Sequence, residues 1–321
     1  MSLDAFPFPF RADTFRYGTN IEPARAFVAT EAGGWGAAVV DLDEHYRDDL
    51  AERARILGED PSRLTVLPHA RPACWDALLY GLRELDAQDD RMTLRQDGDD
   101  YFWRNDLLGL EQEFRFGVDE SLPGGPLGFL GSQIQDDVVL LDQREGALWA
   151  DAGCVTFAAG WSLGFDAGMR FAEIHGPVPR VHDEGIVARA ERFLMRLRPG
   201  EEYRRTNWSM TVDRRLDQSL EAYPSWGPLR ARLGVDELPQ RLHLRVEVQH
   251  LIRLGYSGAV LFLIRTHLAS LASLAAVPAW RERLGRVLAE LPEDMAAYKG
   301  LLPFREAAVR WLLEGLNGPW H

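Results

Sequence analysis

The strongest constraint on the fold is a pair of strand-like segments that flank a short turn in the C-terminal half. Residues 242–249 alternate between apolar and polar side chains, as expected of a strand with two different faces. Residues 258–266 (GAVLFLIRT) form a continuous apolar run, which is typical of a buried strand. Glycines at both ends of the segment 255–258 supply a turn between them, so we predict a β-hairpin. A helix over 244–252 is the alternative, since its apolar residues also fit helical spacing.

Shorter patterns predict the remaining strands. Residues 206–212 alternate, with Trp208 and Met210 on one side and Asn207 on the other, which indicates a half-buried strand. Residues 138–141 and 154–157 are short apolar runs bounded by turn residues, and we expect strands there too.

Five segments carry apolar residues at helical spacing, and we predict helices over 41–57, 72–86, 183–197, 278–291 and 303–316. Asp41 and Asp183 are expected to cap the first and third of these helices, and Pro72 suits a first turn.

Two other stretches are expected to lack regular structure. The run from Phe6 to Phe10 alternates with proline, so it should be extended and lie across the body as an aromatic strap. The polar, acidic stretch after residue 86 ends in SerLeuProGlyGlyPro at 121–126, and we expect a surface connection and an internal boundary there.

Strands with flanking helices and no regular βαβ alternation predict an α+β fold, an antiparallel sheet covered by helices. At 321 residues and 46% hydrophobic composition, the chain can bury a large core. We expect an N-terminal helical and extended region over 1–120, a core over 121–275 and C-terminal helices over 276–321.

Charge and composition exclude several classes of function. A formal net charge of −13 disfavours nucleic acid as a partner, because phosphate backbones would repel the chain. No uninterrupted apolar run is long enough to span a membrane, and the first residues do not look like a secretory signal. The two cysteines, Cys74 and Cys154, are too few for a Cys-only zinc or iron–sulfur site, and cytoplasmic location is the default expectation.

Motifs for nucleotide binding are also missing. The chain has neither GxGxxG after a strand nor GxxxxGK[ST], and it lacks HExxH and CxxC. Chemistry must therefore come from less common arrangements of residues.

His175 is the first candidate, within IleHisGlyProValPro at 174–179. We expect the nearby prolines to hold its backbone extended and stiff, and a rigid imidazole is a good metal ligand. The alternative is a histidine in a proline turn that is satisfied by the backbone.

Two further segments carry polar residues at strand positions. Arg204 and Arg205 precede Asn207 and Trp208, and paired arginines suit carboxylates, although a surface salt bridge is the alternative. The other segment is a polar row that we expect across the hairpin, either lining a pocket or facing solvent: Arg245, Glu247 and Gln249 with Arg265, Thr266 and His267.

In this order, these segments resemble a bacterial family, the α subunits of haem-dependent oxidative N-demethylases, also described as dimethylamine monooxygenases. The resemblance covers most of the chain. Its other pieces are the early PheProPhe, Trp35 with Asp41 and Tyr46, Gln135-Asp136-Asp137, Trp161 with Gly168, SerGlyAlaValLeuPheLeuIleArgThr at 257–266 and AspMetAlaAlaTyrLysGly at 294–300.

The resemblance implies a haem-binding, PAS-like core and an O₂-dependent oxidation of a small secondary methylamine such as dimethylamine. It implies haem b in this chain, and electrons from NADPH through redox partner subunits that carry FMN and a 2Fe–2S cluster. Tetrahydrofolate is a further expected cofactor of the complex, taking up formaldehyde.

The resemblance also suggests roles for individual residues. His175 becomes the axial iron ligand. Glu247 becomes the carboxylate that holds the substrate ammonium, and Asn207 and Gln249 orient substrate or oxygen. Candidates for pairing with haem propionates are Arg204, Arg205, Arg245 and Arg265.

Three positions depart from the family pattern: Asp166 stands where a lysine is usual, Gly255 replaces a proline, and His267 replaces a tyrosine. Two other classes of function remain open, a haem-based gas or redox sensor and a haem-free small-molecule binding protein. Thiolate ligation of haem by Cys154 is a further alternative to His175.

Overall fold

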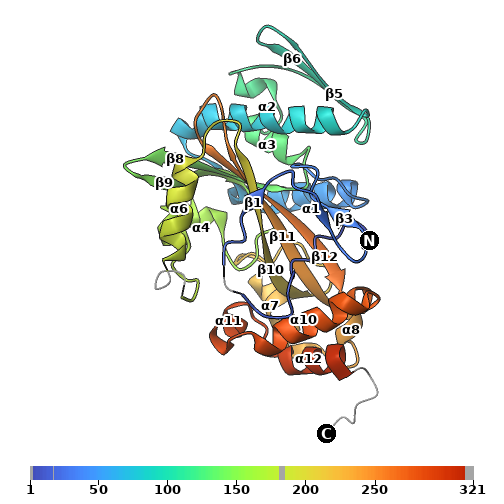
Figure 1. Ribbon diagram of the computed structural model, residues 1–321. Helices are drawn as coiled ribbons and strands as arrows, with labels where there is room; N and C mark the ends of the chain where they lie inside the picture. Colours follow the sequence, from blue (N-terminus) through green and yellow to red (C-terminus); the bar gives the residue numbers. More distant parts are fainter. Residues whose placement is uncertain (1–2, 17, 181–184, 315–321) are drawn as a thin grey trace.

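The computed structural model describes residues 3–16, 18–180 and 185–314, and its centre is one antiparallel sheet of seven strands (Figure 1). The strand order is β1-β10-β11-β12-β8-β9-β4. The long strands are β8 (Asp137–Arg144), β9 (Ala147–Cys154), β10 (Glu202–Val212), β11 (Leu242–Arg253) and β12 (Val260–Ser270). Two short strands close the edges, β1 (Glu22–Pro23) and β4 (Leu64–Val66). This mixture of helices and antiparallel sheet confirms the α+β class.

The predicted hairpin is confirmed, because β11 and β12 pair in register along their whole lengths. The helical alternative for 244–252 is wrong. The predicted strand at 206–212 is also confirmed and begins four residues earlier. The prediction at 154–157 is only partly right, since β9 ends at Cys154. The Asp137 carboxylate accepts the N–H groups of Thr156 and Phe157, which takes them out of the strand pattern.

Strand alternation gives the sheet two faces with different residues. Cross-strand partners point to the same side, so Asn207, Glu247 and Thr266 share one face, here called the Glu247 face. The opposite side of the sheet, here called the Arg265 face, carries the adjacent set of cross-strand partners, Thr206, Val248 and Arg265. Our expectation that Arg265 and His267 lie beside Glu247 is therefore wrong, because only Thr266 of that trio does.

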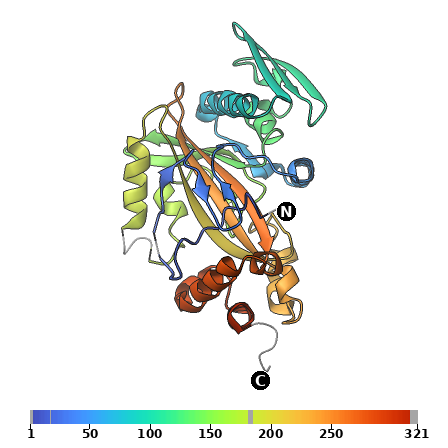
Figure 2. The same ribbon diagram turned by 45° about the vertical axis from the view of Figure 1, so that its right-hand side comes forward.

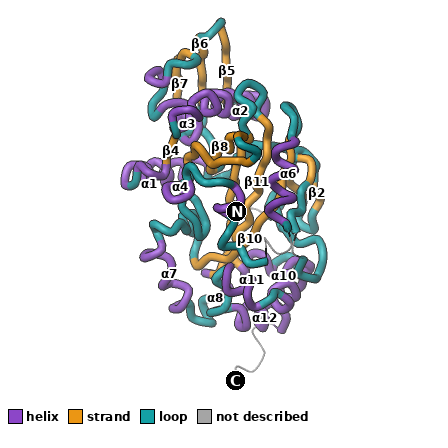
Figure 3. The backbone as a smooth tube through the Cα atoms, turned by 90° about the vertical axis from the view of Figure 1, so that its left-hand side faces the viewer, coloured by secondary structure: helices purple, strands orange, loops and turns teal. Residues whose placement is uncertain are grey.

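Two groups of helices cover the Arg265 face, one at each end. The first is α1 (Tyr46–Glu59), α2 (Arg71–Gln88) and α3 (Gly125–Gly131). Leu78 and Leu82 of α2 pack in one buried cluster with Leu261 and Leu263 of β12. The second group is α8 (Leu238–Arg241), α9 (Leu271–Ala275), α10 (Pro278–Glu290), α11 (Glu293–Tyr298) and α12 (Arg305–Glu314). These C-terminal helices gather at the opposite end of the molecule from α2 and α3 (Figure 3).

The N-terminal segment lies across the same face between these groups, as Figure 2 shows in blue. It includes β2 (Val28–Ala29) and β3 (Gly34–Trp35). Phe6 and Phe8 are buried in the C-terminal core, and Phe8 stacks on Trp280 with ring centroids 4.6 Å apart. The aromatic strap predicted at residues 6–10 is confirmed.

The Glu247 face is covered by α4 (Leu163–Asp166), α5 (Phe171–Ile174) and α6 (Ile186–Arg196), all of which follow β9. Leu194 on α6 packs with Leu251 and Val260 of the sheet. The remaining helix, α7 (Tyr223–Arg232), connects β10 to α8.

The stretch after residue 86 is not an irregular surface connection. It folds into a three-stranded meander beyond α2 and α3 (Figures 2 and 3): β5 (Met92–Asp97), β6 (Asp100–Asn105) and β7 (Leu110–Arg115). Tyr101 and Trp103 on β6 point into the core. The charged residues of the meander make this apolar alternation hard to recognise in the sequence. The described residues also include short 3₁₀ turns at Pro61–Arg63, Pro68–Ala70 and Asp119–Ser121.

The helix predictions hold with shifted ends. The helix predicted from 41 begins at Tyr46, so Asp41 is not its cap. The helix predicted over 72–86 is confirmed as α2. The predicted cap Asp183 lies outside the described residues. Among those residues, no helix is long and apolar enough to cross a membrane.

Candidate functional site

A buried carboxylate with three polar neighbours lies at the centre of the Glu247 face. Glu247 is only 6% exposed. Its Oε2 accepts hydrogen bonds from the Gln249 amide at 2.9 Å and from the Asn207 amide at 3.3 Å, and its Oε1 lies 3.3 Å from Arg245 Nε. Asn207 and Gln249, the other two predicted substrate residues, therefore both contact Glu247. The alternative that this row faces solvent is wrong, since Arg245 and Gln249 are buried as well.

Arg245 is fixed beneath this cluster by its own hydrogen bonds. Its Nη1 donates to the Leu216 carbonyl at 2.6 Å, and its Nη2 donates to the Phe157 carbonyl and to Thr266 Oγ1 at 3.0 Å. The guanidinium is thus a counter-ion for Glu247 and an anchor for two loops. Its donors are engaged within the protein, which leaves little capacity for a propionate.

Strand β10 forms the more open side of the same face. Asn207 and Arg205 point to this side and are half-buried, whereas Arg204 and Trp208, on the other side of the strand, are buried. The more exposed side chains on this face near Glu247 therefore come from β10.

Lys299 is a further buried cation beside β10, although the sequence reasoning did not name it as a site residue. Its Nζ donates to the Trp208 carbonyl at 2.5 Å and lies 4.6 Å from the Trp208 ring centroid. Burial lowers the pKa of Lys299 to about 8, while the negative charge of Glu247 acts in the opposite direction. Its status as the only lysine of the chain, within AspMetAlaAlaTyrLysGly, was the available signal.

His175 lies on the same side of the sheet, at the end of α5. Its Nδ1 lies 2.7 Å from the Phe171 carbonyl, and its ring centroid is 4.2 Å from that of Phe171. Phe171 and Ile174 pack against the buried cluster that includes Leu251 of the Glu247 face. A carbonyl can only accept, so Nδ1 carries a proton and donates it to Phe171.

The backbone of His175 is not extended as predicted. It closes a helical turn with φ −88° and ψ 2°. Proline restricts the residue directly before it, which is Gly176, so His175 is free to adopt this conformation. The histidine is half-buried, and neither of the two cavities described for the structure borders it.

Arg204 and Arg265, both candidates for pairing with haem propionates, lie on the opposite face from Glu247. The sheet separates them from it. Arg204 binds Glu22 at 3.0 Å and the carbonyls of Ala24, Gly36 and Ala26, so it fastens the N-terminal segment. Arg265 forms an ion pair with Asp43 at 2.8 Å.

With this geometry established, the comparison with known families can be stated. A family model described as haem-dependent oxidative N-demethylase, alpha subunit-like, matches residues 34–309 of the 321-residue chain. The chain belongs to this family.

The three departures from the N-demethylase pattern lie away from Glu247. Gly255 is exposed in the β11–β12 turn, and His267 lies on the Arg265 face. Asp166 ends α4, where burial and the nearby Glu221 raise its pKa to about 6. None of the three changes the carboxylate cluster directly.

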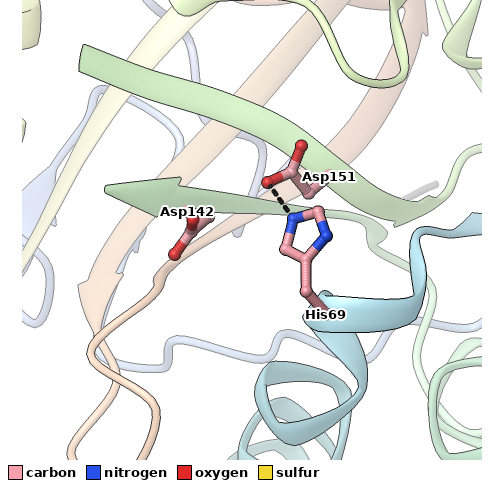
Figure 4. Close-up of side chains that lie close together, drawn as sticks. All are labelled: His69, Asp142 and Asp151. Carbon is pink, nitrogen blue, oxygen red and sulfur yellow. Dashed lines mark hydrogen bonds and ion pairs between the residues drawn. The ribbon is translucent and has the colours of Figure 1, made fainter. Parts of the chain in front are cut away.

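Two other groups in this N-demethylase family member resemble active sites but are structural. His69, Asp142 and Asp151 converge as metal ligands would, with His69 Nε2 2.8 Å from Asp151 Oδ2 (Figure 4). Arg144 already binds both carboxylates, at 2.8 Å for Asp142, so a cation occupies the position.

The second group is Gly160-Trp161-Ser162-Leu163-Gly164, which matches the GxSxG pattern of serine hydrolases. In those enzymes the serine lies at a sharp turn from strand to helix. Here Ser162 Oγ accepts the Phe165 N–H and donates to Glu221, eight residues after the end of β9. Ser162 is therefore a helix cap.

Proposed function

We propose that this chain is the haem-bearing subunit of an oxidative N-demethylase that acts on a small secondary methylamine such as dimethylamine. The observation that carries the proposal is Glu247, a buried carboxylate whose neighbours Asn207 and Gln249 both direct amide groups at it. The balanced reaction consumes the amine, O₂, two electrons and two protons, and gives methylamine, formaldehyde and water.

The sheet order supports a PAS-like core over residues 121–275. Leaving out the edge strands, the order is β9-β8-β12-β11-β10, with α4, α5 and α6 inserted between β9 and β10. PAS domains share this order, and their ligands lie between the inserted helices and the sheet. Here the inserted helices cover the Glu247 face, where His175 and Glu247 both lie.

The types of side chain on this face are those that can hold a haem. His175 offers an imidazole whose orientation is fixed by its bond to Phe171, as is usual for iron ligands. Phe171 and Ile174 offer apolar contact, and Arg205 is the candidate partner for a propionate. Haem b, when bound, would provide the chemistry by which O₂ oxidises the amine.

Glu247 would bind the protonated amine through its two N–H groups. A buried carboxylate is stabilised by a cation, and here Arg245 contacts only one of its oxygens. Asn207 and Gln249 then fix the position of Oε2, which aligns the bound ammonium. The amine proton can pass to Glu247, which keeps the charge within the cluster.

Cys154 is a poorer candidate for the iron ligand than His175. It is fully buried beneath α3, where burial raises the pKa of its thiol to about 11. A neutral thiol is a weak ligand compared with a thiolate.

Electrons would come from NADPH through partner subunits with FMN and a 2Fe–2S cluster. Both cysteines are buried, and the chain has no nucleotide motif, so it needs such partners. The alpha subunit-like description of the family agrees with a complex of several chains. Tetrahydrofolate would accept the formaldehyde. We propose that the complex is cytoplasmic.

The test is an absorption spectrum of the purified full-length chain with haem, followed by a steady-state assay with a redox partner. We expect a Soret band that His175→Ala abolishes and Cys154→Ser preserves. We also expect NADPH consumption that depends on dimethylamine. A Soret band without such consumption would favour a gas or redox sensor, and no Soret band would favour a haem-free binding protein.

A further inference from the structure

A cavity lies on the opposite side of the sheet from Glu247. It is enclosed between the N-terminal segment and the Arg265 face, with a volume of about 220 Å³. A single water needs only roughly 10–15 Å³ on this kind of measure, so the space can hold a small molecule. Phe27 lines it and is itself 65% exposed, so the cavity reaches the surface beside this ring.

Buried polar groups that line this cavity lack partners among the described residues. His250 is 2% exposed, yet neither of its ring nitrogens has a hydrogen bond. The same holds for Nδ1 of His267 and Nε1 of Trp35, which are 4% and 9% exposed. Buried polar groups are almost always hydrogen-bonded, so whatever fills the cavity must satisfy these atoms.

The chemistry of these groups favours a ligand with an acceptor oxygen. Trp35 Nε1 can only donate a hydrogen bond, and each neutral histidine carries one N–H. Burial and nearby arginines lower the pKa values of His250 and His267 to about 3, which keeps both rings neutral. Trp35 and His250 thus present two N–H donors to the cavity, and one acceptor oxygen can satisfy both.

The charges around the cavity favour a neutral ligand over an anion. Arg265 is already balanced by Asp43 at 2.8 Å and by Asp49 at 3.8 Å, and Arg204 by Glu22 at 3.0 Å. Asp41 adds a further carboxylate at the wall. An anion would therefore meet no uncompensated positive charge. Phe27, Trp35 and Val248 offer apolar and aromatic surface for the body of the ligand.

We infer that this cavity binds a small neutral molecule with a carbonyl or amide group on a flat apolar body. The oxygen accepts from His250 and Trp35, and the apolar body lies against the aromatic wall. The Phe27 ring closes over Gly34, where a side chain would come within 2.2 Å of the ring, so this wall depends on glycine. The site is separate from the amine site and does not rest on the proposed function.

The test uses benzamide and benzoate as probes of equal shape and different charge. Saturation-transfer NMR on the purified full-length chain measures binding of each probe. We expect benzamide to bind and benzoate to bind at least about tenfold more weakly, a difference of about 1.4 kcal/mol. Equal binding of the two probes would contradict the inference that the cavity prefers a neutral ligand to an anion. No benzamide binding to folded protein would mean that the cavity holds only water.

His250→Phe is the informative variant, because it keeps a ring and removes both nitrogens. We expect it to weaken benzamide binding at least about tenfold. His243→Phe is the control, since His243 lies on the same strand and points to the other face. Equal loss in both variants, or no loss in either, would contradict the assignment.

A second readout covers the case in which His250→Phe fails to fold. In ¹⁵N-tryptophan-labelled protein, benzamide should shift the indole N–H peak that Trp35→Phe removes. A titration in which that peak stays in place while other peaks move would refute binding at this cavity.

Discussion

Gln249 donates to Glu247 Oε2 across 2.9 Å, from two residues further along the same strand. Side chains two residues apart on a strand lie on the same face, so Gln249 and Glu247 are neighbours wherever this segment is a strand. Asn207 reaches the same oxygen from the neighbouring strand. The carboxylate that is proposed to bind the amine is thus held by two strands, and its orientation does not depend on a loop.

Glu247→Gln should abolish productive binding of the amine. The variant keeps the size of the side chain but loses the charge, so we expect kcat/KM for dimethylamine to fall by roughly 100-fold or more. The Soret band should remain, because His175 is untouched. Steady-state kinetics with the reconstituted redox partner measure the effect. Glu113→Gln on β7 is the control. Unchanged kcat/KM in Glu247→Gln would remove Glu247 from the substrate site.

His175→Gly should lose haem affinity that added imidazole restores. The small cavity left by the side chain can accept free imidazole as a replacement ligand. We expect the Soret band to return with millimolar imidazole, whereas His69→Gly, at a partly exposed site, should keep its haem throughout. Full haem binding by His175→Gly in the absence of imidazole would assign the iron to another ligand.

Arg204 and Arg205 should behave in opposite ways when each is replaced by methionine. Arg204→Met removes the anchor of the N-terminal segment, so the free energy of unfolding should fall by about 3–5 kcal/mol, with haem affinity unchanged in the folded protein. Arg205→Met should weaken haem binding about tenfold with a smaller change in stability.

Urea unfolding and haem titration distinguish the two variants of this pair. If Arg204→Met weakened haem binding more than Arg205→Met did, the assignment of the two faces would be incorrect.

Asp136→Asn should stabilise the protein at neutral pH. Asp136 is fully buried, and burial raises the pKa of its carboxyl from 3.8 to about 7. The folded state therefore holds this proton more tightly than the unfolded state does, and wild-type stability from this group is lost as pH rises from about 4 to 7. We expect the advantage of the variant to grow over this window to about 3–4 kcal/mol.

The measurement is urea unfolding at pH 4.5, 6.0 and 7.5, with Asp90→Asn at an exposed position as the control. An advantage that is the same at all three values would show that titration of Asp136 is not its origin.

The sequence predicted the hairpin and its polar row well, because alternation and the glycine turn are both local signals. It did not predict which polar residues share a face. Arg265 and His267 were assigned to the Glu247 site, although a strand sends them to the opposite side from Thr266. The register between strands decides this, and register is not visible in a single segment.

The cavity on the Arg265 face also could not be predicted from the sequence. Trp35 and His250 are 215 positions apart, and only the path of the N-terminal segment over the sheet brings them together. The meander over 92–115 was missed for a different reason. Charged residues such as Arg95 and Asp97 lie on its exposed positions and weaken the apolar pattern that marks a strand.

The alternation of β10, β11 and β12 has a consequence for how this protein can change over evolutionary time. Neighbours in sequence lie on different faces of the sheet, so losing or gaining one residue inside these strands would exchange the side chains of the two faces. His250 would then project where Gln249 does now. A point substitution changes the side chains of one face alone, whereas insertions and deletions should be confined to the loops beyond the strand ends.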